Sequence, residues 1–325
     1  MSGGATDGLS RIAITGSSGL YGRSLIVEIR RRLPKARILG IDLRPADVDP
    51  PDDFHQGDIA SPRQAEAVVR FGPDTIVHLA YAVQPGRDTA ALRITNVDGT
   101  QAVLDVAAAV QPRRLLVASS ATIYGAWPDN PPACDETTPI RPLAGYYYSA
   151  HKGIVERMVR EFAEASPRVA VSWTRPAIVV GRGVHNFLAD YFLGVPFVCL
   201  PDGRDTPLQF VHRDDLARAT LAILLGSARG PFNVAPEDAM THREIARALG
   251  VPAVPMPYAV MAGIGRLWWT LRLPWLATPP GLVGYVRHPW VMTSARLRDE
   301  LGFAFDYSSA AAFAELVAGD DQRAG

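Results

Sequence analysis

The chain has 325 residues, of which 20% are charged, and 33 lysine and arginine residues balance 33 aspartate and glutamate residues. This length allows about two domain-sized units that share a large core. Because there is no excess of positive charge, we expect no binding to nucleic acid and no general attraction to an anionic membrane.

The first eight residues are small and polar and lack the basic start and apolar core of a signal peptide. The two cysteines, Cys134 and Cys199, have neither CxxC nor Cys/His spacing. They therefore indicate no disulfide framework and no zinc site. We expect a cytoplasmic protein with free or buried thiols.

An apolar strand leads directly into a glycine-rich turn. Ile12 to Ile14 precede Gly16, Gly19 and Gly22, and a helical pattern follows over residues 24–32. In this setting the glycines allow a tight turn, close approach of a pyrophosphate and close packing of the helix on the sheet. The amides at the start of the helix face the phosphates. The turn predicts a dinucleotide site.

An acidic residue ends the next strand. Asp42 lies twenty residues past Gly22, where a carboxylate accepts hydrogen bonds from a ribose diol and repels a 2′-phosphate. We therefore expect NAD as the cofactor. Arg44 and the basic run at residues 30–32 are able to attract that phosphate, so NADP is not excluded. Farther on, Asp58 and Ile59 are placed to flank an adenine ring.

Helix and strand patterns then alternate. Helical patterns cover residues 61–71 and 90–110, and apolar strands cover residues 75–80 and 114–118. This alternation predicts a doubly wound α/β architecture with a parallel sheet, a Rossmann domain.

Hydroxyl groups follow the strand at 114–118, at the end of a parallel strand where ligands bind. Farther on, Tyr148 and Lys152 are four residues apart at the start of a helix that runs to about Glu164, so they share one helix face. An ammonium near a phenol favours its ionised form, and lowering the phenol pKa by about three units from about 10 would give a usable acid or base near neutral pH.

Six motifs in this order resemble those of the extended short-chain dehydrogenase/reductase family, which includes the NAD-dependent epimerases and dehydratases. They are Thr15-Gly16-x-x-Gly19-x-x-Gly22, Asp42, His78-Leu79-Ala80, Asn96-Val-x-Gly-Thr100, Ser119-Ser120 and Tyr148-x-x-x-Lys152. The similarity covers roughly residues 10 to 235 and includes the segments 175–181 and 209–217.

The resemblance implies roles for individual residues. Tyr148 would transfer the proton, Lys152 would hold the nicotinamide ribose and tune the phenol, and Ser120 would hydrogen-bond the reacting oxygen, with Thr122 assisting. The implied cofactor-binding set is Gly16, Ser18, Gly19, Leu20, Gly22, Asp42, Arg44, Asp58, Ile59, Leu79, Ala80, Asn96, Tyr148, Lys152 and Pro176. We expect a small-molecule substrate and a homodimer.

Beyond Gly181 the alternation becomes irregular, apart from a strand near 231–235 and a short helix near 241–249. We therefore expect two interleaved domains. Residues 1–180 plus about 207–237 form the Rossmann domain. A smaller C-terminal substrate-binding lid takes about 181–206 and 238–325.

Residues 261–290 are rich in tryptophan and proline. Arg266, Arg272 and the prolines interrupt any run of about twenty apolar residues, so we expect no transmembrane span. Three interpretations stay open: the core of the lid, the wall of a lipophilic pocket, or an interfacial membrane or dimer patch. The last would make the protein peripheral to a membrane.

His212, Asp214 and Asp215 resemble a metal cluster in the sequence, but an aspartate before the apolar run 216–225 is typical of a helix start. We expect no metal.

The substrate is the least constrained prediction. In UDP-galactose-epimerase-like members an arginine contacts the diphosphate where this chain has Leu208, and a diphosphate buried beside leucine would be costly. Arg182, Arg204 or Arg287 could substitute from other loops. We expect hydride transfer at a secondary alcohol or ketone of a lipophilic substrate.

Two alternatives remain: an NAD-dependent nucleotide-sugar epimerase and a non-catalytic NAD(P)-sensing regulator. Dehydration is not expected, because related 4,6-dehydratases carry an Asp-Glu pair where this chain has Ala121 and Thr122.

Overall fold

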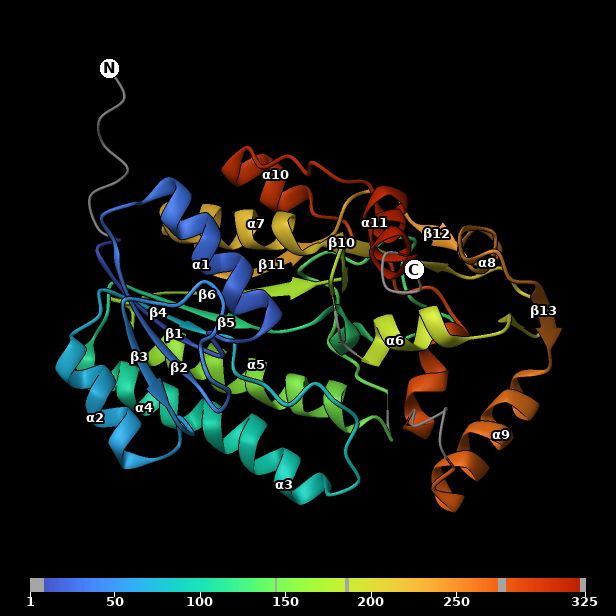
Figure 1. The fold of residues 1–325 in the computed structure, drawn as a ribbon, viewed down its shortest axis with the longest axis horizontal. Coiled ribbons are helices and arrows are strands. Elements are labelled where there is room, and N and C mark those ends of the chain that lie inside the picture. Colours follow the sequence, from blue (N-terminus) through green and yellow to red (C-terminus); the bar gives the residue numbers. More distant parts are fainter. Residues whose placement is uncertain (1–8, 144, 185–186, 274–278, 322–325) are drawn as a thin grey trace.

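A parallel sheet of seven strands forms the centre of the N-terminal part of the protein (Figure 1). The computed structural model describes residues 9–143, 145–184, 187–273 and 279–321. The order β11-β6-β5-β4-β1-β2-β3 runs outward in both directions from the β1–β4 pair, which makes the sheet doubly wound, as predicted. The strands are β1 Arg11–Thr15, β2 Arg37–Asp42, β3 Asp53–Gln56, β4 Thr75–His78, β5 Arg114–Ala118, β6 Ala170–Pro176 and β11 Gly230–Val234.

Helices cover both faces of this sheet (Figure 1). One layer contains α1 (Leu20–Arg32) and α7 (Arg213–Leu225), which pack against each other. The other contains α2 (Pro62–Phe71), α4 (Gly99–Val110) and α5 (Tyr147–Ala165).

The residues of β1 show why the sheet is buried on both sides. Ile12 and Ile14 belong to the apolar core beneath α1 and α7, whereas Ala13 belongs to the core on the opposite face. Alternate residues of a strand point to opposite faces, so a strand covered on both sides must be apolar throughout.

The helical pattern predicted over residues 90–110 is interrupted in the structure. It consists of α3 (Thr89–Arg93), a π-helical turn (η1, Ile94–Asp98) and α4. The π turn contains the buried Asn96. One extra residue in a helical turn changes the direction of the side chains there, and such turns are frequent at functional sites.

The C-terminal part is built from short elements. Three small strand pairs join segments far apart in the sequence: β7 (Ile178–Val180) with β10 (Phe210–His212), β8 (Val198–Pro201) with β13 (Ala253–Met256), and β9 (Pro207–Leu208) with β12 (Met240–Thr241). The helices are α6 Phe187–Gly194, α8 His242–Leu249, α9 Tyr258–Leu271, α10 Ala295–Leu301 and α11 Ser309–Asp321, with the 3-10 segment η3 Pro280–Val286.

The tryptophan-rich stretch begins within α9, a regular helix at one end of the molecule (Figure 1, orange). The described ranges contain no helix that is both long enough and apolar enough to cross a bilayer. Trp275 and its neighbours from 274 to 278 lie outside the described residues.

Candidate active site

The glycine-rich turn that joins β1 to α1 has no space for a side chain at Gly16 or at Gly22. Gly16 has φ +75°, and a Cβ there would be 2.6 Å from the Ala80 nitrogen. A Cβ on Gly22 would be 2.3 Å from the Gly16 carbonyl oxygen. Gly19 is the N-cap of α1 and offers no capping side chain. The amides of the first turn therefore keep their capacity to bind an anion such as a pyrophosphate.

Asp42, at the end of β2, closes this turn from the other side. Its carboxylate accepts hydrogen bonds from the amides of Ser18 and Arg44, both at 2.9 Å. The Arg44 guanidinium lies 3.6 Å from the same carboxylate and would be 3.3 Å from a Cβ on Gly19. A carboxylate and a guanidinium therefore both lie next to the glycine turn.

Asp58 and Ile59 follow β3 on the same side of the sheet. Asp58 is exposed and accepts a hydrogen bond from the Ala60 amide at 2.9 Å, and Ile59 is buried. Leu20, Leu79 and Ala80 are half-buried around the turn.

A buried chain of hydrogen bonds lies behind Leu79 and Ala80. The Thr100 hydroxyl donates to the Asn96 carbonyl at 2.6 Å, so it accepts from His78 Nε2 at 3.0 Å. His78 Nδ1 is then the acceptor for the Thr15 hydroxyl at 2.7 Å. Burial lowers the pKa of His78 to about 3, so the ring is neutral.

Asn96 lies at the end of this series of hydrogen bonds, and its side-chain amide can still donate to a ligand. Its Oδ1 accepts from the Ala82 amide at 2.7 Å. Its Nδ2 is buried and has no hydrogen-bond partner within the described part of the chain. A buried donor without a partner costs free energy, so this amide is suited to a bound ligand. The glycine turn and Asn96 together fit a dinucleotide.

Ser120, Thr122 and Tyr148 lie together beyond the end of β5. The Ser120 Oγ accepts hydrogen bonds from the Thr122 hydroxyl at 3.0 Å and from its amide at 3.2 Å. Ser120 also hydrogen-bonds the Tyr148 phenol. Burial raises the pKa of Tyr148 to about 12, and the hydrogen bond to Ser120 opposes that rise.

Lys152 is buried beneath Tyr148. Its Nζ donates to the Ala118 carbonyl at 2.6 Å and lies 3.4 Å from the centre of the Tyr81 ring, but 5.8 Å from the centre of the Tyr148 ring. Burial lowers the pKa of Lys152 to about 7, and the nearby Glu156 opposes this shift. The sequence predicted a phenol pKa lowered by the lysine. That expectation differs from the structure, because burial dominates both groups.

Two tyrosines at this site were not predicted. The Tyr81 ring makes an edge contact with Tyr148 at 5.4 Å between centres. The Tyr285 hydroxyl donates to the Thr122 carbonyl at 2.6 Å. Tyr81 directly follows the His78-Leu79-Ala80 motif at the end of a parallel strand. Because ligands bind at such strand ends, this position could have marked Tyr81 in the sequence as a site residue. Tyr285 comes from η3, so only the fold brings it here.

A buried ion pair supports the site from behind. Arg175 and Glu156 are 2.7 Å apart, and each side chain is 1% exposed. Glu156 also accepts from the Ser119 hydroxyl at 2.6 Å, and Arg175 donates to the Tyr124 hydroxyl at 2.8 Å. Glu156 lies four residues after Lys152 on α5, so the pair fixes this helix against β6. Pro176, which is buried, ends that strand.

The residues that resembled a metal cluster have other roles. His212 is the N-cap of α7, where its ring accepts from the Asp214 amide at 3.3 Å. Asp215 accepts from the amides of Asp306 and Tyr307. The helix start was predicted, but its cap is the histidine rather than an aspartate. Across the described ranges no cluster of three or more potential ligands is arranged to hold a metal.

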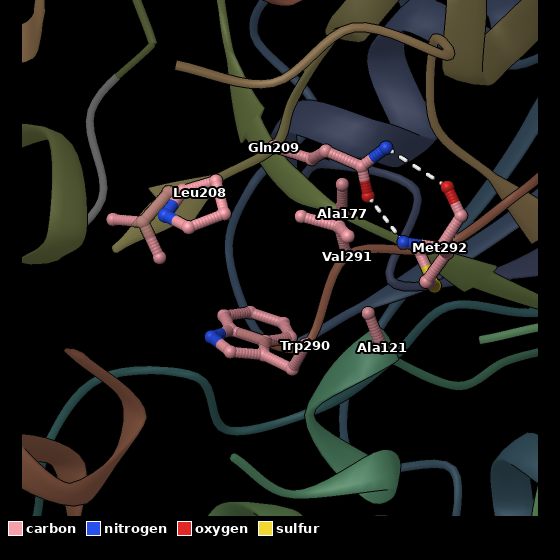
Figure 2. A pocket seen from close by; sticks show the side chains of 8 residues that line it. Ala121, Ala177, Leu208, Gln209, Trp290, Val291 and Met292 are labelled. Carbon is pink, nitrogen blue, oxygen red and sulfur yellow. Dashed lines mark hydrogen bonds between the residues drawn. The ribbon is translucent and has the colours of Figure 1, made fainter. Parts of the chain in front are cut away.

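A small apolar pocket lies beside Ala121, next to Ser120 in the chain (Figure 2). It is lined by Ala121, Ala177, Pro207, Leu208, Gln209, Trp290, Val291 and Met292. The Gln209 amide donates to the Pro236 and Met292 carbonyls, both at 2.9 Å, and accepts from the Met292 amide at 2.6 Å. The Gln209 side chain is therefore occupied within the protein, as is the Trp290 indole N–H, which donates to the Tyr285 carbonyl at 2.9 Å.

The chain is similar to several known proteins. An uncharacterized protein of Mycobacterium tuberculosis (strain ATCC 25618 / H37Rv) is 26% identical over 270 residues, which are 82% of this chain and 71% of the relative. The dTDP-glucose 4,6-dehydratase of Streptomyces niveus is 27% identical over 215 residues, or 60% of this chain and 59% of that enzyme.

Among solved structures, the UDP-glucose-4-epimerase of Stenotrophomonas maltophila with bound NAD has a TM-score of 0.76 at 18% identity, with 97% of this chain and all of that chain covered. MoeE5 in complex with UDP-glucuronic acid and NAD has a TM-score of 0.74 at 20% identity, with 97% of this chain and all of that chain covered. At these identities the likeness supports the fold.

The sequence profile of the NAD dependent epimerase/dehydratase family matches residues 12–235, which contain the glycine turn, Asp42, Ser120, Tyr148 and Lys152. The protein therefore belongs to this family and is an NAD-dependent enzyme of the extended short-chain dehydrogenase/reductase type.

Proposed function

We propose that the enzyme transfers hydride at a secondary alcohol or ketone of a lipophilic substrate. The observation that carries this proposal is the apolar lining beside Ala121, where Leu208 is 3% exposed and Trp290 is 9% exposed. The gap enclosed by this lining is about 10 Å³, room for about one water molecule, so the substrate would lie against the lining rather than inside the gap. Pockets for apolar ligands are lined by aliphatic and aromatic groups, with a few polar groups that orient the reacting atom. Here Ser120 and Tyr148, which lie outside this lining, would be the groups that orient the reacting atom.

The proton would pass through Tyr148. A phenol with a pKa of about 12 is protonated at neutral pH, so it can donate a proton to a substrate carbonyl oxygen as that oxygen gains negative charge. Ser120 would hydrogen-bond the same oxygen, and Thr122 would hold the Ser120 hydroxyl in place. Lys152 would bind the ribose next to the reacting ring. When bound, NAD(H) supplies or accepts the hydride.

We propose that the cofactor lies along the ends of β1, β2 and β4. The amides at the start of α1, from Leu20 to Gly22, would hold the pyrophosphate, with Gly16, Ser18 and Gly19 of the turn lying against it, and Asp42 would hold the adenosine ribose. Arg44 would border that ribose. Asp58 and Ile59 would contact the adenine, while Leu79, Ala80, Asn96 and Pro176 would enclose the nicotinamide half.

We also propose that the segments 181–206 and 238–325 form the substrate-binding unit. Their pairing in β8 and β13 supports this division, as does the contribution of residues 290–292 to the pocket lining.

A nucleotide-sugar epimerase is the second candidate, because similar structures hold UDP-sugars with NAD and one similar enzyme is a dTDP-glucose dehydratase. A diphosphate needs cations. The candidate arginines have partners or lie in the open: Arg182 is 3.3 Å from Glu315, Arg287 is 3.8 Å from Asp202, and Arg204 is exposed. These contacts favour the lipophilic substrate.

A thermal-shift screen of the NAD-loaded protein tests the choice. We expect sterols or polycyclic ketones to raise the melting temperature, because a ligand that binds only the folded state stabilises it by mass action. UDP, GDP and dTDP sugars form the comparison set, and the same compounds with the cofactor-free protein are the control. Stabilisation by UDP or another nucleotide alone would establish the sugar-nucleotide alternative instead.

A further inference from the structure

The helix α9 carries a stripe of exposed apolar side chains. Val260, Ile264, Leu267 and Leu271 are 48%, 38%, 52% and 57% exposed. At about 100° per residue they fall within about 60° of arc on one helix face. Scattered exposed aliphatic residues are ordinary, but four in register along one helix form a continuous apolar surface.

The opposite face of α9 packs against the rest of the protein. Gly265 is buried there, and a Cβ on it would be 3.2 Å from Val283 of η3. The Arg87 guanidinium lies 4.3 Å from the centre of the Trp269 ring. The Arg287 guanidinium lies at the same distance from the centre of the Tyr258 ring. These contacts keep the stripe turned away from the rest of the described protein.

The charged residues in the sequence around this helix are all basic. The sequence from 245 to 298 contains no aspartate or glutamate, although the whole chain has equal numbers of acidic and basic residues. The six basic residues of this segment are Arg247, Arg266, Arg272, Arg287, Arg296 and Arg298. Arg266 and Arg272 are exposed on α9 and at its C-cap.

Among the described residues, the carboxylate of Asp202, from another segment, contacts the helix. Asp202 accepts from the Tyr258 amide at 2.8 Å, at the N-terminal end of α9, and lies 3.8 Å from Arg287. The C-terminal half of the helix, which carries Leu267, Leu271 and both exposed arginines, is therefore apolar and basic.

We propose that α9 docks the protein on the surface of an anionic lipid bilayer. The helix would lie in the plane of the interface, with its apolar stripe at the boundary of the acyl chains and its arginines near the headgroup phosphates. An apolar face combined with basic residues is the pattern of helices that lie on membranes, and anionic lipids attract such arginines.

A second copy of the chain fits this surface less well. A two-fold interface would bring the same patch of both copies together. Arg266 and Arg272 would then meet their own counterparts, and their segment has no carboxylate to pair with them. Like charges brought together repel each other, whereas lipid phosphates neutralise them. The inference goes beyond the proposed function and does not depend on it, because binding can be measured without turnover.

Flotation of the full-length protein with vesicles tests the proposal. We expect it to float with vesicles of phosphatidylcholine and phosphatidylglycerol, and to float much less with phosphatidylcholine alone or at high ionic strength. Leu267→Glu should lower the bound fraction about tenfold, because it removes an apolar anchor and adds a negative charge.

Val69→Glu on α2 is the matched control. Val69 is 50% exposed, so the substitution also replaces an exposed aliphatic side chain with glutamate, on another helix, and it should leave vesicle binding intact. Both variants should keep the circular dichroism and melting temperature of the parent protein. Equal binding by the two variants, or no binding of the parent protein to anionic vesicles, would overturn the proposal. A dimer that Leu267→Glu converts to a monomer would assign the stripe to a second copy.

Discussion

At the scale of single residues, burial sets the protonation of the proposed catalytic pair. Burial raises the pKa of Tyr148 to about 12 and lowers that of Lys152 to about 7. Burial disfavours the charged form of every group, so the phenol keeps its proton and the amine tends to lose one. Between pH 7 and 12 both side chains are mainly neutral, which limits the free-energy cost of burying them. The direction of neither pKa shift could be predicted from the spacing of four residues between Tyr148 and Lys152.

Tyr148→Phe isolates the proton transfer. The variant keeps the ring that contacts Tyr81 and Tyr146 but removes the hydroxyl, so turnover should fall by about 10² to 10⁴ fold. NADH affinity, measured by fluorescence titration, should stay within a few fold. Tyr147→Phe is the control, since its hydroxyl donates to the Gln84 carbonyl outside the site. Undiminished turnover in the Tyr148 variant would remove the mechanism.

His78→Gln should change how stability depends on pH. The ring has a pKa of about 3 in the folded protein against about 6.5 when unfolded. Between these values the unfolded chain binds a proton that the folded protein does not, so acidification destabilises the fold. Between pH 4 and 6 this difference makes the free energy of unfolding of the parent protein rise by about 1.4 kcal/mol per pH unit, and the variant should lack this contribution. Urea unfolding measures it, and at pH 8 the slopes should agree.

At the scale of elements, strand–turn–helix units were predictable because their residue types are dictated locally. The strand predicted over 114–118 is present, and the glycine spacing correctly predicted the tight turn between β1 and α1. The π turn at Ile94–Asp98 was missed because its residues have an ordinary helical pattern. For α9, glycine and tryptophan obscured a regular helix. The helix α11 is alanine-rich with no clear apolar face in the sequence.

Gly22→Ala tests the tightness of the cofactor turn. The new Cβ would be 2.3 Å from the backbone oxygen of Gly16, so the turn must move, and NAD binding should weaken by at least about tenfold. Isothermal titration measures the affinity. Gly263→Ala is the matched control, since this helical glycine has open space around it. There alanine should leave NAD binding unchanged and stabilise the fold by up to about 1 kcal/mol.

At the scale of the whole molecule, one buried polar network connects the sheet, the helix α5 and a distant loop. Arg175 of β6 contacts Glu156 of α5 and Tyr124, and Tyr124 donates to Asn233 of β11 at 2.7 Å. Asn233 in turn donates to the carbonyls of Cys134 and Thr293. The motif at 175–181 was visible in the sequence. Its partners were not, because they come from segments 19 to 109 residues apart that only the fold brings together.

Glu156→Gln should be strongly destabilising. It leaves the Arg175 guanidinium buried without its counter-charge, which typically costs about 3–5 kcal/mol. The double variant Glu156→Gln with Arg175→Met should recover part of this loss, because it removes the unpaired charge as well. Urea unfolding of both variants and the parent protein measures the difference. Equal stability of the single variant and the parent protein would contradict an ion pair formed in solution.

The position of β11 at the edge of the sheet has a consequence during synthesis. Every residue of β6 is buried, yet one of its two neighbours, β11, begins only at Gly230. A nascent chain that has emerged only to about residue 229 therefore holds a six-stranded sheet with an open, apolar edge. Unpaired edges recruit other strands, and incomplete chains on the ribosome are prone to such contacts. We therefore expect the chain to be prone to strand-mediated association between the translation of β6 and that of β11.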